Sequence, residues 1–197
     1  MTTPKSSVDE IRTRFDHDVD RFSNLQTGQS ATIDAPLVLD LLSSAAFTTT
    51  PHARHILDVG CGAGNNTLKL LERFSSPPAP ATPHTMAPHF RILPQIDVTL
   101  IDLSLPMLQR ARERIAPLTR GTLTTLQTDI RSADLPSESI DIILAAAVLH
   151  HLRTDAEWEA VFSLFFRILR PGGSLWISDL ITHTSAPIQN LMWQRYG

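Results

Sequence analysis

Cysteine and long apolar segments are both scarce in this sequence. Its 197 residues include one cysteine, so no disulfide can form within the chain. The longest uninterrupted apolar run, Ile142 to Leu149, is far shorter than the roughly 20 residues that a membrane-spanning helix needs. The first residues also lack the apolar region of a secretory signal peptide. We therefore expect a cytoplasmic protein without a membrane span.

A large charge of either sign is missing as well. The formal net charge is −3, which provides no global electrostatic footprint for nucleic acid. Hydrophobic residues make up 42% of the chain and charged residues 19%, an ordinary balance for a globular protein. A chain of this length suits one domain with a complete core. Composition therefore disfavours a nucleic-acid partner.

The most distinctive segment is a glycine-rich loop that follows an apolar run. It reads Ile56-Leu57-Asp58-Val59-Gly60-Cys61-Gly62-Ala63-Gly64, and a helix-compatible stretch comes next. Glycine permits positive φ and close approach of a ligand to the backbone. The N–H groups at a helix start favour a negatively charged or carbonyl group. We interpret the segment as a strand, a ligand-binding loop and a helix, with Asp58 at the strand end where open α/β sheets bind ligands.

The main alternative for this loop is the dinucleotide-binding fingerprint G-x-G-x-x-G. If Gly60 and Gly62 occupy its first two glycine positions, Asn65 stands where the third glycine should allow close helix–strand packing. Asp58 would also repel a pyrophosphate, whereas it can accept hydrogen bonds from an ammonium group. The loop therefore suits a cationic ligand better than a nicotinamide dinucleotide, although the oxidoreductase alternative stays open.

Strand and helix patterns alternate along the chain, which favours an α/β fold with an open, mostly parallel, doubly wound sheet. A Pro-rich stretch over residues 75–95 is expected to be a surface insertion. An amphipathic helix over residues 8–25 is either a packing helix or a lid over a ligand. We divide the chain into an N-terminal helical cap, residues 1–50, and a ligand-binding domain, residues 51–197. The remaining expected helices cover residues 37–47, 65–74, 106–116, 155–169 and 188–196, and the strands cover 55–59, 96–101, 122–127, 140–146 and 174–179.

Asp102 is a candidate for ribose binding because it ends the second expected strand. A ribose-binding acid normally follows the glycine loop by roughly 20 residues. Asp102 lies farther along, and the Pro-rich insertion accounts for the difference. A strand-end carboxylate can accept hydrogen bonds from both ribose hydroxyls. The alternative is a solvated carboxylate with no ligand.

Five ordered segments resemble the class I S-adenosylmethionine-dependent methyltransferases. This resemblance implies a Rossmann-like sheet of strand order 3-2-1-4-5, S-adenosylmethionine as cofactor, and methyl transfer to an acceptor. The amino-methyltransferase motif N-P-P-Y of nucleic-acid enzymes is absent, so a small-molecule acceptor is expected. The segments are the glycine loop, Asp102 to Leu108, Gln127 to Ile130, Ala145 to Leu152, and Leu169 to Leu175 with its L-x-P-G-G turn.

The resemblance also implies cofactor-binding residues. Leu103 and Met107 would pack on the adenine, although Met107 could equally be a core residue. Asp129 would accept from the adenine amino group and Ile130 would donate through its backbone, although Asp129 could instead cap a helix or turn. Small alanines such as Ala145 would leave room beside the methyl group. The predicted cofactor-binding residues are Asp58, Gly60, Cys61, Gly62, Gly64, Asp102, Leu103, Met107, Asp129, Ile130 and Ala145.

No catalytic residue follows directly from the sequence. His150 could be a general base at neutral pH, or it could be structural and only line the site. The histidines, including His52 and His55, show no metal-binding pattern, and no metal is expected.

The chain departs from the family pattern at its C-terminus. Class I methyltransferases usually have seven strands, and here strands six and seven are not found, so we expect a truncated C-terminus. The unpaired fifth strand and an apolar terminal segment would then favour self-association. A methyltransferase fold that binds the cofactor or a partner without turnover is an alternative. Segments 15–19 and 192–197 also resemble carboxy-S-adenosylmethionine synthases of tRNA modification, which gives a further alternative.

Overall fold

A five-stranded parallel sheet forms the centre of the structure, a computed structural model that describes residues 6–23, 35–75, 93–179 and 181–196. The strand order is β3-β2-β1-β4-β5, and every neighbouring pair is parallel. The predicted Rossmann-like fold class and strand order are confirmed. The strands are β1 (His55–Val59), β2 (Asp97–Asp102), β3 (Leu123–Gln127), β4 (Ile140–Ala146) and β5 (Leu169–Ser178).

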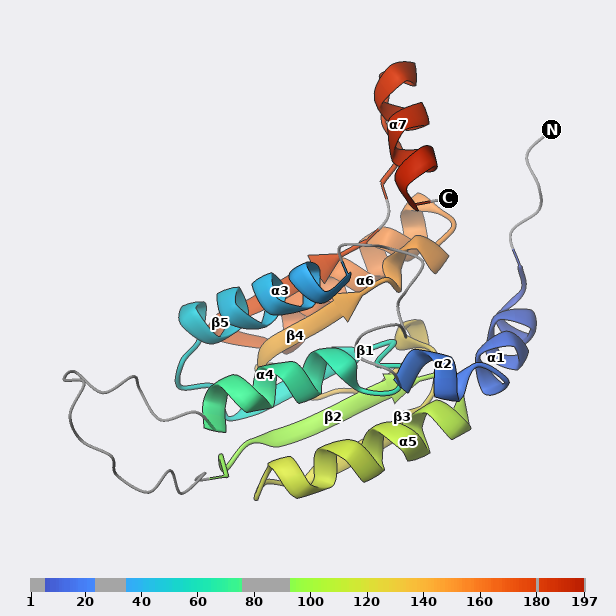
Figure 1. The fold of residues 1–197 in the computed structure, drawn as a ribbon. Coiled ribbons are helices and arrows are strands. Elements are labelled where there is room, and N and C mark those ends of the chain that lie inside the picture. The colour runs from blue at the N-terminus through green and yellow to red at the C-terminus, as the bar shows by residue number, and fades with distance from the viewer. Residues whose placement is uncertain (1–5, 24–34, 76–92, 180, 197) are drawn as a thin grey trace, which may run out of the picture.

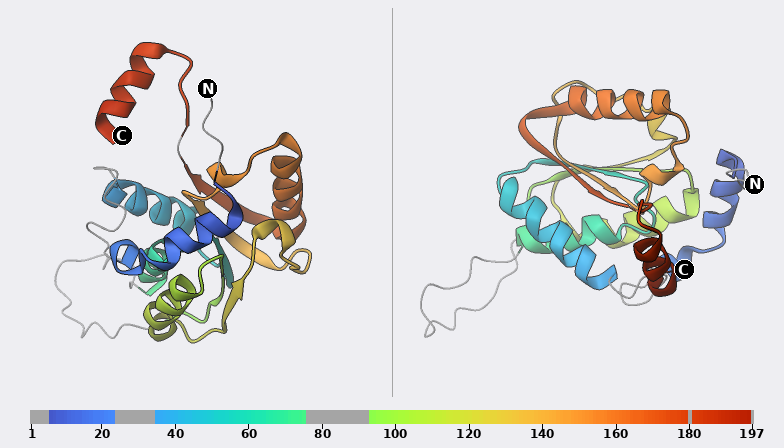
Figure 2. Two further views of the ribbon diagram at one scale, coloured as in Figure 1. Left: turned by 90° about the vertical axis from the view of Figure 1, so that its right-hand side faces the viewer. Right: turned by 90° about the horizontal axis from the view of Figure 1, so that it is seen from above.

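Helices cover both faces of the sheet (Figure 1). Three helices, α3 (Ala35–Thr49), α4 (Asn65–Ser75) and α5 (Leu105–Ile115), lie on one face, and α6 (Asp155–Ile168) lies on the other (Figure 2). Leu42 and Ala46 of α3 are in the core on this first face, so α3 packs with the sheet although the sequence had grouped it with the N-terminal cap. Short 3₁₀ helices are η1 (Ala116–Leu118), η2 (Ile130–Ser132) and η3 (Leu149–His151).

Alternation along the strands explains the two hydrophobic layers. Successive side chains of a strand point to opposite faces. Ile56 of β1 therefore packs with Leu70 and Leu108 of the α3–α4–α5 layer, and Leu57 packs with Val161 and Phe165 of α6. A strand buried on both sides needs this continuous apolar sequence.

The expected helix over residues 8–25 is two helices, α1 (Val8–Asp16) and α2 (Val19–Ser23). The break has a local cause at His17. Its ring Nδ1 lies 2.7 Å from the Thr13 carbonyl oxygen, which is the acceptor that its own backbone N–H would use in a continuing helix. That N–H donates instead to the Phe15 carbonyl. Both helices lie at the carboxyl ends of the strands (Figure 1).

The fifth strand begins earlier than predicted. The expected turn Pro171-Gly172-Gly173 lies inside β5 as a bulge, because Ile140 pairs with Leu169 and Ile142 pairs with Ser174. Gly172 has φ +82°, which favours glycine. A Cβ on Gly173 would lie within 3.0 Å of the Arg170 and Asp141 carbonyl oxygens, so that position also requires glycine.

The last helix, α7 (Ala186–Tyr196), projects away from the sheet beyond β5 (Figures 1 and 2). Of the expected Pro-rich insertion, residues 76–92 lie outside the described residues. Within the described part of the chain, no helix is both long enough and apolar enough to cross a membrane.

Candidate functional site

A cavity of about 510 Å³ opens at the carboxyl ends of the strands. Parallel α/β sheets bind ligands at this edge. The glycine loop after β1, the ends of β2 and β4, and the segments after β3 and β4 form its floor, while α1 and α2 contribute Ile11, Phe15 and Phe22 from above. The cavity therefore lies between the residues of the sequence motifs and the N-terminal helices.

Positive φ angles at Gly60, Gly62 and Gly64 shape the loop. A Cβ on Gly60 would lie 2.4 Å from Val148 Cγ2, and one on Gly64 would lie 2.6 Å from Ile115 Cδ1. A Cβ on Gly62 would meet nothing within 4 Å. Gly60 and Gly64 thus permit close packing, and Gly62 presents open backbone to the cavity.

Asp102 connects the loop to the next helix. One carboxylate oxygen accepts from the Gly62 N–H at 2.8 Å, and the other accepts from the Ser104 N–H at 2.9 Å. Burial raises the pKa of Asp102 above its usual value, and these backbone donors oppose the rise. Each oxygen retains a second lone pair, so the carboxylate can also accept from a ligand in the cavity that it lines.

The predicted adenine-side residues gather at one end of the cavity. Leu103, Met107 and Ile130 all line it, and Met107 is buried there. Asp129 caps η2 through the Arg131 N–H and forms an ion pair with the Arg131 guanidinium at 2.6 Å. The hydrogen bond from Arg131 holds the pKa of Asp129 below its usual value. Asp129 is therefore an ionised turn-capping residue that also faces the cavity.

Three predicted residues, Asp58, Gly64 and Ala145, are not part of the cavity lining. Ala145 belongs to the buried α6-side cluster, and Ala146 and Ala147 line the cavity in its place. Gly64 faces Ile115 and Ala111 of α5. The other predicted residues line the cavity, and contact of any of them with a cofactor stays a prediction.

Asp58 lies buried beneath the loop. Its Oδ2 accepts from Thr67 Oγ1 at 2.7 Å, and its Oδ1 has no hydrogen-bond partner among the described residues. Burial raises the pKa of Asp58 to about 7, while the Thr67 hydrogen bonds act in the opposite direction. An unpaired buried carboxylate oxygen is costly, and burial of this kind favours the protonated carboxyl group.

His150 and Asp179 form a pair that the sequence did not predict. His150 Nδ1 lies 2.7 Å from Asp179 Oδ1, and the His150 backbone N–H donates to Asp179 Oδ2 at 3.0 Å. His150 follows β4 and Asp179 follows β5, so the pairing of these strands brings the two residues together. A carboxylate on Nδ1 fixes the tautomer that leaves Nε2 as an acceptor. The sequence feature that could have indicated this pair is the position of Asp179 at the end of the fifth expected strand.

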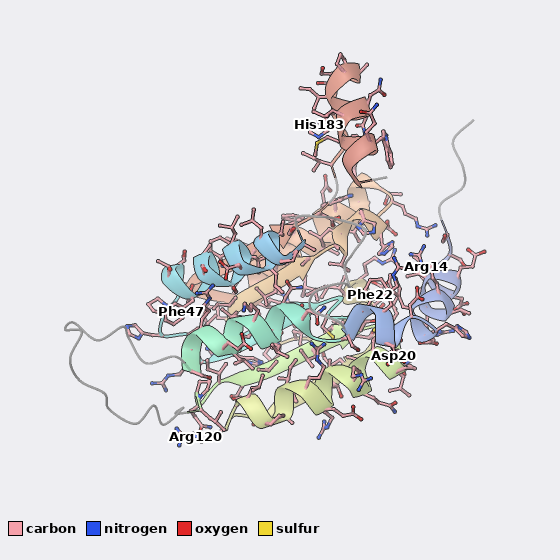
Figure 3. All side chains as sticks on the ribbon, viewed as in Figure 1. Arg14, Asp20, Phe22, Phe47, Arg120 and His183 are labelled. Carbon is pink, nitrogen blue, oxygen red and sulfur yellow. The ribbon has the colours of Figure 1, made fainter. Side chains whose placement is uncertain are left out.

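The N-terminal helices contribute residues that the motifs did not indicate. Asn65, which replaces the third fingerprint glycine, donates from Nδ2 to the Phe22 carbonyl of α2 at 2.8 Å and accepts from Arg114 Nη1 at 2.8 Å. Arg110 of α5 also forms an ion pair with Asp20 of α2 at 2.9 Å. These contacts hold α2 against the loop helix and α5. Figure 3 labels Asp20 and Phe22 on α2.

No group of three or more histidine, cysteine, aspartate or glutamate side chains with metal-binding geometry occurs among the residues that the structure covers. The described lining thus combines a glycine loop, two carboxylates, apolar contacts and a paired histidine. This set can bind a polar ligand by hydrogen bonds, with His150 Nε2 as an acceptor in the tautomer that the Asp179 contact favours.

Comparison with known proteins identifies relatives of this chain. Residues 57–175 match a family described as "Methyltransferase domain". An uncharacterised methyltransferase of Mycobacterium bovis is 28% identical over 138 residues, which cover 70% of this chain and 55% of the relative. A trans-aconitate 2-methyltransferase of Acidovorax is 35% identical over 131 residues, which cover 66% of this chain and 40% of the relative. The match thus spans only about half the length of these curated relatives.

A solved structure has the same fold. The N-methyltransferase NodS of Bradyrhizobium japonicum, in complex with S-adenosyl-L-homocysteine, aligns with a TM-score of 0.60 at 20% identity. The alignment covers 84% of this chain and 71% of that chain.

Proposed function

This chain belongs to the class I S-adenosylmethionine-dependent methyltransferase superfamily, and we propose that it transfers the methyl group of S-adenosylmethionine to a small-molecule acceptor. The observation that carries the proposal is the cavity at the carboxyl edge of the sheet, where the open backbone at Gly62 and the Asp102 carboxylate meet. The matched relatives include methyltransferases named for small molecules, which supports the acceptor class.

The residues present fit this cofactor. Asp102 would accept from the ribose hydroxyls, and Leu103, Met107 and Ile130 supply apolar surface for the adenine. The loop at Gly60 and Gly62 would hold the methionine portion. Asp58 lies beneath the loop and outside the cavity lining, so the proposal assigns no direct ligand contact to its unpaired Oδ1.

The bound cofactor supplies an electrophilic methyl group on a sulfonium. The chain mainly supplies positioning and exclusion of water, with α1 and α2 over the cavity. In our proposal His150 is the general base, because it lines the cavity and Asp179 holds its Nδ1–H. Its Nε2 would accept the proton that the nucleophilic atom of the acceptor loses.

A transfer assay tests the proposal. The full chain is incubated with methyl-labelled S-adenosylmethionine and a panel of small acids, amines and phenols, and label is followed into the products. We expect transfer to at least one acceptor, and we expect His150→Gln and Asp179→Asn to lower kcat at least tenfold while S-adenosylhomocysteine affinity is kept. His52→Gln, a substitution of an exposed histidine that does not line the cavity, is the matched control.

Two outcomes would contradict the proposal in different ways. Cofactor binding without label transfer to any acceptor would favour a binding protein that lacks turnover. Full activity in both His150→Gln and Asp179→Asn would remove the general-base role and leave positioning as the catalytic contribution.

A further inference from the structure

The charge of the cavity changes from one end to the other. Among the lining residues that the structure describes, the carboxylates are Asp102 and Asp129, both on the cofactor side, where Arg131 pairs with Asp129. The opposite end, below α1, carries Arg14 and Arg153 together with His151 and the paired His150. An acceptor that enters from α1 therefore meets positive and hydrogen-bonding groups.

A second, smaller cavity of about 280 Å³ adjoins this end. Its lining residues are Ser6, Ile11, Arg14, His150, His151 and Arg153. All but Ser6 also line the larger cavity, so the two hollows meet around the same cationic side chains. No carboxylate is part of the smaller lining in the described chain.

Aromatic contacts bring these groups together. The Arg14 guanidinium lies over the Phe15 ring, 5.0 Å from its centroid, and Phe15 meets His151 edge-on at 6.4 Å. The His150 and His151 ring centroids are 4.1 Å apart. Figure 3 places Arg14 on α1, at the end of the sheet where Phe22 also lies. Arg14 is thus oriented by a neighbouring ring while it faces the cavity.

Carboxylates lie near this end without lining the smaller cavity. Asp179 contacts His150, Glu10 accepts from the Ser7 backbone in the α1 capping box and lies near Arg153, and Glu157 pairs with Arg131. Among the described lining residues, the charged side chains that face the smaller cavity are therefore those of Arg14 and Arg153. Burial, followed by the charges of His150 and Arg14, lowers the pKa of His151 to about 4, so its ring is neutral near pH 7. A neutral imidazole can still donate one hydrogen bond.

We infer that Arg14, Arg153 and His151 form a subsite that binds an oxyanion of the methyl acceptor, either a carboxylate or a phosphate group. Guanidinium groups recognise both anions through charge-assisted, bidentate hydrogen bonds. The inference rests on the proposed function, because it assigns the acceptor class of that same site. The acceptor would hold its anionic group under α1 and present its nucleophilic atom toward His150.

Calorimetry on the full chain saturated with S-adenosylhomocysteine tests the subsite. Tricarballylate and inorganic phosphate are titrated separately, so that the tighter of the two indicates a carboxylate-bearing or a phosphate-bearing acceptor. We expect Arg14→Gln and Arg153→Gln to weaken anion binding at least tenfold, and Arg14→Lys to retain more of it than Arg14→Gln. S-adenosylhomocysteine affinity, measured first for each protein, reports that the variant is folded.

Arg12→Gln is the matched control, because Arg12 is also on α1, pairs with Asp9 and does not line either cavity. It removes the same charge and should leave anion binding unchanged. Equal anion affinity in the wild type, Arg14→Gln and Arg153→Gln would overturn the inference, as would no anion binding by the saturated wild type. Failure of the wild type to bind S-adenosylhomocysteine in the first titration would instead overturn the proposed function itself.

Discussion

Asp102 illustrates how a single residue connects the local sequence to the site. Its two oxygens hold the Gly62 and Ser104 backbones, so the same carboxylate fixes the loop and the start of α5. This residue could be predicted, because its motif is local and the end of a strand defines its direction. The prediction for Ala145 was wrong by one position. Neighbouring residues of a strand face opposite sides, so Ala146 lines the cavity and Ala145 does not.

Replacement of Asp102 should weaken cofactor binding. Asp102→Ala removes the proposed ribose acceptor and leaves two backbone donors without their partner, so we expect a loss of roughly 1–3 kcal/mol in S-adenosylhomocysteine binding. Calorimetry measures this loss. Asp134→Ala, at an exposed carboxylate outside the cavity, should change nothing. Unchanged binding in Asp102→Ala would contradict the ribose assignment.

His151 should make stability depend on pH. Its pKa is about 4 in the folded protein, through burial and then the charge of His150, with Arg14, Asp179 and Arg153 also acting on it. The unfolded side chain has a pKa of about 6.5, so the unfolded state binds more protons between these values. The His151 contribution is complete above pH 6.5 and is lost as the pH falls toward 4. Relative to His151→Gln, wild-type stability in urea should therefore rise from pH 4 to pH 6.5, and a constant difference would contradict the burial of His151.

Elements were predicted well where hydrophobic periodicity decides them and less well where side chains compete with the backbone. The strands coincide with apolar runs in the sequence. Helix α5 begins directly after its N-cap residue, Ser104. The break at His17 depends on a side-chain contact with Thr13, and the β5 bulge depends on the register with β4. Neither of these is visible in residue periodicity.

The capping box of α1 gives a prediction at this scale. Ser7 Oγ accepts from the Glu10 N–H, and Glu10 accepts from the Ser7 N–H. Ser7→Ala should cost about 0.5–2 kcal/mol of helix stability. The Ser7→Ala substitution should therefore increase amide exchange in α1. Because α1 lines the cavity, we also expect a higher KM for the acceptor. Thr154→Ala removes the equivalent cap of α6 and should leave α1 exchange unchanged. Unchanged α1 exchange in Ser7→Ala would show that tertiary contacts alone hold the helix.

The arrangement of the whole molecule explains which site residues could not be predicted from the sequence. The glycine loop and Asp102 lie within short motifs, so sequence alone could identify them. Arg14 enters the cavity through the packing of α1, and Asp179 meets His150 through the β4–β5 pairing. Such contacts join segments that are distant in sequence, and no local pattern specifies them.

Exposed apolar side chains at the molecular surface predict self-association. Phe166 on α6 is 87% exposed, Trp193 on α7 is 65% exposed, and β5 is an edge strand of the sheet within the described part of the chain. Large exposed apolar groups and unpaired strand edges favour association. Light scattering of the 197-residue chain should show a mass that rises with concentration, and Phe166→Lys should reduce it. Leu105→Lys, at an exposed residue on α5, is the control, and a monomer at every concentration would contradict the prediction.

The central claim is that the cavity binds S-adenosylmethionine, and direct titration calorimetry tests it most directly. S-adenosylmethionine, S-adenosylhomocysteine and NADH are each titrated into the full chain under the same buffer and salt. The account predicts saturable one-to-one binding of the first two ligands, with NADH binding more weakly or not at all. Tighter binding of NADH, or no binding of S-adenosylmethionine and S-adenosylhomocysteine, would contradict it.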